Sequence, residues 1–280
     1  MNIATGMCLD HVSVSLRGRE VIHDLSARFE RGHVTALLGP NGSGKSTLLA
    51  CLAGLLRPQS GRALIDGVDV MALEARIRAQ RIGLLPQTVE VHWDIDVATL
   101  VSLGRFPHRG RWGETAADRA AISRAMSAMD LTPFAMRSVK RLSGGERGRA
   151  LLARVLATEP EWLLADEPLA NLDPAHQLDV LDRLRAIAAR GAGVIVVVHD
   201  LSHAARVADS VLLLREGRVV AHGPHEAVLS AEDLRAAFDI DVHIGNAASD
   251  EEASAAVSGD DARGHAANGR RFVVPLRRSS

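Results

Sequence analysis

The residues from Val34 to Leu48 constrain this chain more than any other stretch. An apolar run, V-T-A-L-L, leads into G-P-N-G-S-G-K-S-T and then into a second apolar run. This is the spacing G-x-x-x-x-G-K-[ST] of a loop that binds phosphate between a buried strand and a helix. Glycines let backbone amides turn inward around an anion, and the helix start adds its positive dipole end. The stretch therefore predicts a nucleotide site in an α/β fold.

The side chains of this loop suit a nucleoside triphosphate with Mg²⁺. Lys45 would reach the β- and γ-phosphates, and the Ser46 hydroxyl would bind the metal. Lys45 and Lys140 are the only lysines in the chain, and a compact ammonium is not interchangeable with a guanidinium fork. A dinucleotide fingerprint, G-x-G-x-x-G, does not fit, because its third glycine would fall on Thr47. The expected nucleotide-binding residues are Gly39, Pro40, Asn41, Gly42, Ser43, Gly44, Lys45, Ser46 and Thr47.

Composition sets broad limits on the class of protein. The chain has 280 residues, 47% of them hydrophobic and 24% charged, as in an ordinary globular protein. Its formal net charge of −1 gives no general attraction to nucleic acid or anionic lipid. Cys8 and Cys51 are expected to be reduced thiols. We expect no signal peptide and no membrane span, because no apolar run approaches about 18 residues.

Strands and helices alternate along most of the chain, which predicts a mostly parallel sheet covered on both faces. Two antiparallel strands, Leu9–Leu16 and Val21–Phe29, come first, and a helix is expected from Lys45 to Arg57. Residues 88–158 show helical periodicity instead and are expected to form an inserted helical subdomain. Further strands are expected at 63–65, 81–85, 162–166, 194–198, 211–214 and 218–221, and helices at 97–103, 115–129, 145–157, 174–189, 224–229 and 231–238.

The C-terminal part changes texture after Ile244. Residues 245–269 are small and polar, with five acids, and are expected to form a flexible loop. Residues 270–280 are expected to form a C-terminal strand and tail. Because Phe272–Leu276 is apolar again, we predict that it pairs with Asp241–Ile244 as a hairpin.

Two adjacent carboxylates follow an apolar strand farther along the chain. In Leu163-Leu164-Ala165-Asp166-Glu167-Pro168 they stand at the carboxyl end of the strand, where open α/β sheets bind ligands. Asp166 suits Mg²⁺, which prefers oxygen ligands, and Glu167 suits the base that polarises an attacking water.

A third motif, Leu142-Ser143-Gly144-Gly145-Glu146, opens a helix. Ser143 is a good N-cap, and the two glycines ahead of the helix make a second anion-binding helix start. By itself the motif is also consistent with a merely capped helix. Its place in the order of motifs along the chain favours a functional role.

Taken in order, these motifs resemble the ATP-binding subunits of ABC transporters over roughly Met7–Ile244. The resemblance implies an α/β fold, a P-loop NTPase of ABC type, whose ATPase domain spans residues 1–244. The matching features, in chain order, are G-P-N-G-S-G-K-S-T as Walker A, Gln87 as the Q-loop residue, L-S-G-G-E as signature, L-L-A-D-E-P as Walker B, Asn171-Leu172-Asp173 as D-loop and His199 as switch histidine.

The family mechanism implies two ATP molecules held head to tail between two copies of the chain. Ser143, Gly144 and Gly145 of one copy would close on the γ-phosphate held by Lys45 of the other. The resemblance assigns catalytic roles to Glu167, His199 and Gln87, nucleotide contacts to the signature residues and Asp173, and Mg²⁺ ligation to Ser46, Gln87 and Asp166.

A narrower resemblance points to importers of metal chelates: iron siderophores, haem and cobalamin. It rests on Val97–His108, V-A-T-L-V-S-L-G-R-F-P-H, and on S-G-G-E in place of the commoner S-G-G-Q. The implied partners are integral-membrane permease subunits, a second copy of the chain and, indirectly, a periplasmic or extracellular substrate-binding protein. The implied location is peripheral, at the cytoplasmic face of the inner (plasma) membrane. One departure is Leu16, which stands where the family has an aromatic side chain that stacks on adenine.

Several alternatives remain open at this point. The chain would also suit an importer of another small solute, a nucleotide-gated dimerisation module, or a non-transport ABC-type ATPase acting on nucleic acid or ribosomes. A single nucleotide domain and a near-neutral charge disfavour the last of these and give no nucleic-acid partner. A zinc hydrolase is the rival enzyme class, since His199 and His203 are four residues apart. Its H-E-x-x-H motif, however, needs glutamate where Asp200 stands.

Overall fold

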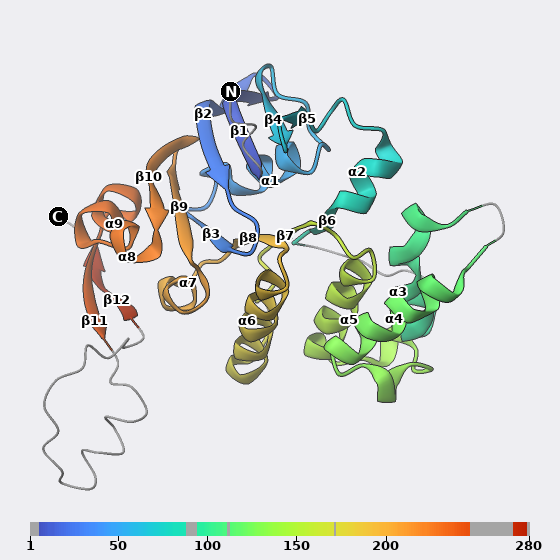
Figure 1. Ribbon diagram of the computed structural model, residues 1–280. Coiled ribbons are helices and arrows are strands. Elements are labelled where there is room, and N and C mark those ends of the chain that lie inside the picture. The colour runs from blue at the N-terminus through green and yellow to red at the C-terminus, as the bar shows by residue number, and fades with distance from the viewer. Residues whose placement is uncertain (1–5, 88–93, 111–112, 171, 247–270, 279–280) are drawn as a thin grey trace, which may run out of the picture.

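The computed structural model describes residues 6–87, 94–110, 113–170, 172–246 and 271–278. Its centre is a six-stranded sheet in the order β10-β9-β3-β8-β7-β6 (Figure 1). The neighbouring pairs from β9 to β6 are parallel, and β10 is antiparallel to β9. The strands of this sheet are β3 (Val34–Leu38), β6 (Ile82–Leu85), β7 (Trp162–Asp166), β8 (Gly193–Val197), β9 (Ser210–Arg215) and β10 (Arg218–Pro224).

The central strands are apolar along their whole length because both faces of the sheet are covered. In β3, Ala36 and Leu38 pack into one core cluster and Leu37 into the other, and β7, β8 and β9 alternate in the same way. One cluster lies under the antiparallel sheet and α1 (Lys45–Leu52), and the other lies under α6 (Pro174–Ala189), α7 (Leu201–Val207) and the helical insertion. This is the pattern of a parallel sheet buried on two sides.

The second sheet is antiparallel, in the order β2-β1-β4-β5. The predicted N-terminal hairpin is confirmed, with Met7 paired to Phe29 and Leu16 to Arg19. Its strands are β1 (Met7–Leu16), β2 (Arg19–Phe29), β4 (Ser60–Ile65) and β5 (Val68–Asp69).

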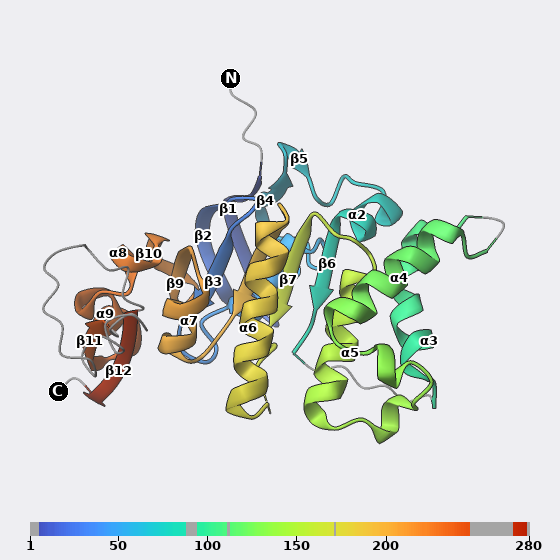
Figure 2. The same cartoon turned by 60° about the horizontal axis from the view of Figure 1, so that its bottom comes forward.

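The helical elements of the insertion lie beyond the β6 edge of the central sheet, at the end opposite the C-terminal hairpin (Figures 1 and 2). The three predicted helices are present, with each boundary shifted by at most one residue. The elements are α3 (Val97–Ser102), η1 (Leu103–His108), α4 (Ala116–Ala128), η2 (Thr132–Phe134), η3 (Val139–Arg141) and α5 (Gly144–Leu156). Residues 88–93, where the insertion was expected to begin, lie outside the described residues.

The prediction for the helix after the phosphate loop was wrong at its C-terminal end. Helix α1 ends at Leu52 rather than Arg57, because Gly54 adopts a left-handed conformation (φ 67°) that terminates the helix. Helix α2 (Ala75–Arg81) was not predicted, since it buries none of its residues and so shows no apolar periodicity.

The chain closes with α8 (His225–Val228), α9 (Ala231–Phe238), β11 (Ile240–Asn246) and β12 (Arg271–Arg278). The predicted terminal hairpin is present, with Val242 paired to Pro275 and Ile244 to Val273. The stretch between the two strands, expected to be a flexible loop, lies outside the described residues.

Candidate functional site

The phosphate loop connects the buried end of β3 to α1, as predicted. At Gly39, a Cβ atom would lie 2.2 Å from the carbonyl oxygen of Leu214, so the loop can pass the neighbouring strand only without a side chain. Gly44 caps α1 at φ 101°, a conformation that L side chains rarely adopt. The glycines therefore give the loop the turns that carry it from β3 into the start of α1, and such a helix start suits an anion.

Lys45 is buried inside this loop and is only 6% exposed. Its Nζ donates to the carbonyl oxygens of Gly39 (2.8 Å) and Pro40 (2.9 Å). Burial lowers the pKa of Lys45, while the charges of Glu167 and Asp166 oppose that shift. The ammonium is thus held at the loop by weak carbonyl partners, and a phosphate would offer it full negative charges.

Asp166 ends β7 beside the loop. It is 8% exposed, and its Oδ1 is buried without a hydrogen-bond partner among the described residues. Burial raises the pKa of this carboxyl, and a hydrogen bond from Ser46 opposes the rise. A buried carboxylate oxygen with an unused lone pair, next to a hydroxyl, fits Mg²⁺, which takes oxygen ligands. The expected ligands Ser46 and Asp166 are therefore adjacent in the structure.

Glu167 lies at the centre of a cluster contributed by three neighbouring strands. Gln87 follows β6 and donates its Nε2 to Glu167 Oε2 at 2.8 Å. His199 follows β8, and its Nε2 lies 2.6 Å from Glu167 Oε1. Glu167 itself has φ 52°, an uncommon conformation for a residue with a side chain. The three residues with predicted catalytic roles thus meet at the carboxyl edge of the sheet.

These residues share a surface cavity of about 490 Å³ with the phosphate loop. Neither Asp166 nor Leu16 is among the residues that line it. Val21, from the strand after the N-terminal turn, lines it instead and carries no motif that could have revealed it from sequence. The lining residues are Val21, Asn41, Gly42, Gly44, Lys45, Ser46, Thr47, Gln87, Glu167 and His199.

The signature residues lie elsewhere and do not line this cavity. Ser143 caps α5 through a reciprocal capping box with Glu146, at 3.2 and 2.8 Å. Across from it, Asp173 caps α6 and its Oδ2 lies 2.7 Å from His176 Nδ1. A Cβ on Gly145 would lie 3.2 Å from the His176 ring. The structure therefore joins the signature and Asp173 through His176, a residue that the sequence analysis missed. Asn171 lies outside the described residues.

The geometry around His199 and His203 does not support the alternative hypothesis of a zinc hydrolase. Asp200 caps α7 by accepting from the backbone of Ser202 and His203, and the His199 ring faces Glu167. The described part of the chain contains no group of three or more His, Cys, Asp or Glu side chains that could hold a metal ion. None of its helices is long and apolar enough to cross a bilayer.

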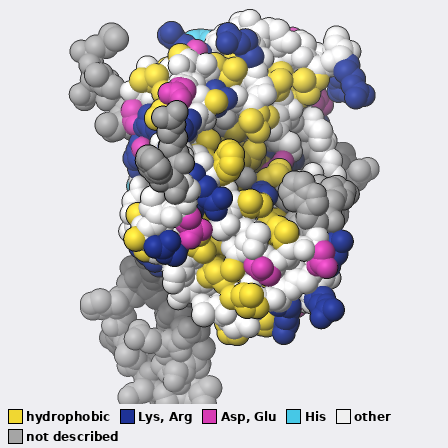
Figure 3. All heavy atoms as spheres, turned by 90° about the vertical axis from the view of Figure 1, so that its right-hand side faces the viewer, with side chains coloured by type: hydrophobic (Ala, Val, Ile, Leu, Met, Phe, Trp, Pro, Cys, Tyr) yellow, Lys and Arg dark blue, Asp and Glu magenta, His cyan; other side chains and the backbone are white. Residues whose placement is uncertain are grey.

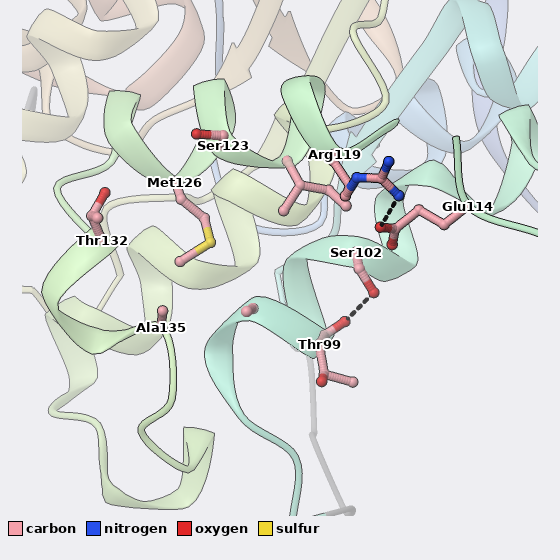
Figure 4. Close-up of a pocket in the computed structure, with 10 residues that line it drawn as sticks. Thr99, Ser102, Glu114, Arg119, Ser123, Met126, Thr132 and Ala135 are labelled. Atoms are coloured by element: carbon pink, nitrogen blue, oxygen red, sulfur yellow. Dashed lines mark hydrogen bonds and ion pairs between the residues drawn. The ribbon is translucent and has the colours of Figure 1, made fainter. Parts of the chain in front are cut away.

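A separate pocket of about 430 Å³ lies on the helical insertion, between α3, α4 and η2 (Figure 4). Its walls include Ala98, Thr99, Met126 and Ala135, and an ion pair between Glu114 and Arg119 lies at one side. None of the predicted nucleotide or catalytic residues lines it. It is therefore distinct from the phosphate site.

The sequence of the chain matches a family of known proteins. The model of that family, ABC transporter, matches residues 22–170. The cobalamin import ATP-binding protein BtuD of Halobacterium salinarum is 41% identical over 235 residues, which are 84% of this chain and 59% of that protein. The hemin import ATP-binding protein HmuV of Pseudomonas entomophila is 43% identical over 231 residues, which are 80% of this chain and 89% of that protein. The chain thus spans less than two thirds of the first relative and most of the second.

Solved structures agree with the sequence matches. A metal-chelate type ABC transporter in an inward-facing conformation superimposes with a TM-score of 0.80 at 26% identity, covering 98% of this chain and 98% of that chain. A dimeric ATP-binding cassette with ADP and phosphate bound gives a TM-score of 0.70 at 26% identity, covering 78% of this chain and 98% of that chain. With a family model that matches more than half of the chain and relatives above 40% identity, the chain belongs to the ABC transporter family.

Proposed function

We propose that this chain is the ATP-hydrolysing subunit of an ABC importer for a metal chelate, such as an iron siderophore, haem or cobalamin. The observation that carries ATP hydrolysis is Glu167, held between Gln87 and His199 at the cavity that contains Lys45. The relatives named for cobalamin and hemin import support the class of substrate. An importer of another small solute is the runner-up.

In this proposal the loop amides and Lys45 bind the β- and γ-phosphates of ATP. Ser46, Asp166 and Gln87 would hold Mg²⁺, which neutralises phosphate charge as the bond to the leaving ADP breaks. Glu167 orients the attacking water and accepts its proton. Glu167 Oε2 accepts a hydrogen bond from Gln87 and Oε1 lies 2.6 Å from His199 Nε2, and a carboxylate oxygen has a second lone pair for that water. His199 would contact the γ-phosphate, as the family mechanism implies.

The proposed unit is a head-to-tail dimer of two copies. Ser143, Gly144 and Gly145 lie outside the cavity of their own chain, so within one copy they line no part of the phosphate site. The start of α5 is a helix N-terminus suited to an anion. The match to a dimeric cassette with ADP and phosphate supports this arrangement. Asp173 would lie at the interface beside the signature, through His176.

The metal-chelate class has support from the C-terminal region and from the turn η1. A match that covers 98% of the chain must include the terminal hairpin. In η1, Arg105 is buried and donates to Asp118 Oδ1 and to the carbonyl oxygen of Ala157, each at 2.8 Å. A Cβ on Gly104 would lie 1.9 Å from the carbonyl oxygen of Arg154. The L-G-R-F-P-H motif thus fixes η1 against the end of the signature helix α5.

The helical insertion is the surface that we propose for the permease, at the cytoplasmic face of the inner membrane. Hydrophobic side chains gather among charged ones on this face of the molecule (Figure 3). Phe106 is 74% exposed at the tip of the fixed turn η1, and Leu103 is partly exposed beside it. Exposed apolar side chains that gather on one face can mark an interaction site. A segment of a membrane subunit is the partner that the family offers for it.

Glu167→Gln tests the hydrolytic part of the proposal. The amide keeps the shape of the side chain but accepts no proton, so turnover should fall by about 10²–10⁴-fold. Binding of a fluorescent ATP analogue should stay within about twofold of wild type, because Lys45 and the loop are intact. A Glu167→Gln variant with full turnover would remove Glu167 as the base.

A pull-down from detergent-solubilised membranes tests the transport part. Tagged Glu167→Gln is incubated with Mg-ATP, co-purifying proteins are identified, and the matching substrate-binding protein is assayed for iron, haem or cobalamin. A many-helix permease with such a ligand supports chelate import, and a permease with another ligand supports the runner-up. Recovery of soluble or ribosomal partners alone would favour a non-transport ATPase. Recovery of the chain alone, as an ATP-dependent dimer, would favour a dimerisation module.

A further inference from the structure

The C-terminal hairpin is attached to the helix that follows His199. Strand β12 packs on α7, and the Ser202 hydroxyl donates to the carbonyl oxygen of Val273 at 3.0 Å. Val273 is only 2% exposed and joins the core cluster that contains Leu201 and Ala205. Main-chain and side-chain atoms of the terminal strand therefore hold the first turn of α7.

His199, the histidine with the proposed catalytic role, lies between the end of β8 and this first turn of α7. Asp200 caps α7 by accepting from the N–H groups of Ser202 (2.7 Å) and His203 (3.3 Å). The preceding residue, His199, contacts Glu167 and is 47% exposed, so its orientation depends on a few contacts. Ser202 is joined by its backbone to the Asp200 cap and by its side chain to the hairpin. A displacement of this turn would move the His199 ring relative to Glu167.

The other end of the hairpin is fixed to the central sheet. Asp239 ends α9 in a left-handed conformation, and Arg215 at the end of β9 donates to both of its carboxylate oxygens at 2.8 Å. Strand β11 begins at the next residue, and Arg235 forms an ion pair with Asp241. Strand β9 also pairs with β3, which leads into the phosphate loop. The hairpin thus spans from a strand next to β3 to the start of α7.

We propose that hairpin β11–β12 positions His199 for ATP hydrolysis, with Ser202 as the positioning residue and the Val273 carbonyl as its anchor. The inference rests on the proposed ATPase function. It gives the C-terminal strand a task in the reaction, which the motifs of the core do not suggest.

Ser202→Ala is the direct test. Turnover number should fall about three- to tenfold while KM for ATP stays at its wild-type value, because phosphate binding is intact and only the His199 geometry is loosened. Ser202→Thr keeps the hydroxyl and should keep wild-type turnover. Val228→Ala removes buried volume from α8 in the same core cluster. It should lower Tm without lowering the turnover number, which separates positioning from general loss of packing.

A double-mutant cycle adds a readout that a merely structural role would not move. In a His199→Ala background, measured as residual single-turnover hydrolysis, Ser202→Ala should lower the rate no further. Wild-type turnover in Ser202→Ala, or an equal loss with and without His199, overturns the proposal. A wild-type chain without ATPase activity would instead contradict the proposed function on which the inference rests.

Discussion

The chain carries two helix starts suited to phosphate, and they differ in how well their own polar groups are satisfied. At the start of α1, Lys45 is buried on weak carbonyl partners, and Asp166 has a buried oxygen without a partner in the described structure. At the start of α5, Ser143 and Glu146 satisfy each other in a capping box. The start of α1 therefore has polar groups with weak partners or none in the described structure, whereas the polar groups at the start of α5 satisfy one another.

The pKa values of the two carboxyls, Asp166 and Glu146, are shifted in opposite directions because their surroundings differ. Burial raises the pKa of Asp166, so its charged form is disfavoured in the empty protein. The backbone N–H of Ser143 lowers the pKa of Glu146, so its charged form is favoured. The comparison teaches that the polar groups of the α1 region suit the ion and nucleotide of the proposed site. The α5 region has its own polar groups satisfied and, in the proposed dimer, would close on the nucleotide held by the other copy.

The largest expected effects come from one substitution in each of the two regions. Lys45→Ala should weaken ATP binding by over about 100-fold, because truncating a buried charged partner costs roughly 3 kcal/mol or more. Ser143→Asp should abolish turnover while a single chain still binds ATP normally, because its added charge repels a γ-phosphate only when a second copy closes. Binding titrations at low protein concentration and steady-state ATPase assays measure the two effects.

Ser143→Thr is the matched control, since threonine, like aspartate, is a good N-cap. Ser143→Thr should keep most of the turnover. Lys45→Ala, Ser143→Asp and Ser143→Thr should all have melting temperatures close to that of the wild type. Loss of ATP binding in Ser143→Asp would mean that the two regions are not separable in one chain.

Asp166→Asn should separate stability from activity. The raised folded pKa means that the ionised carboxyl opposes folding of the empty protein at neutral pH, and this penalty disappears as pH falls through the folded pKa. The amide should therefore raise Tm at pH 7 without nucleotide, while Mg²⁺-dependent turnover falls about 100-fold or more. Thermal melts from pH 4 to 8 should show the Tm gain shrinking toward acid. A lower Tm at pH 7 would refute the burial argument.

The smallest effect concerns the base of the nucleotide. Leu16 offers no aromatic face for stacking on the base, so we expect ATP and GTP to be turned over at similar rates. Leu16→Tyr should tighten ATP binding by about two- to tenfold, since an aromatic stack contributes roughly 0.5–1.5 kcal/mol. Parallel titrations with ATP and GTP check this. Strict ATP preference in the wild type would contradict it.

The sequence motifs were enough to predict the parts of the fold that contain them. Which of these residues contact one another could be seen only in the structure. The loop at Lys45 and the strand before Asp166 were readable because apolar runs flank fixed spacings. The hydrogen bond from Gln87 to Glu167 and the ring of His176 against Gly145 join residues that are distant or unmarked in the sequence. Helix α2 escaped prediction because it buries none of its residues, so no pattern reports it.

Mixing two inactive variants tests the central claim, that each ATP site is shared between two copies. Lys45→Ala and Ser143→Asp are each assayed alone and then together under ATPase conditions. In a mixed dimer, one site combines the intact Lys45 of one chain with the intact Ser143 of the other. Random pairing in a two-fold dimer should therefore restore about a quarter of the wild-type activity. A mixture that stays as inactive as its components would contradict the shared site.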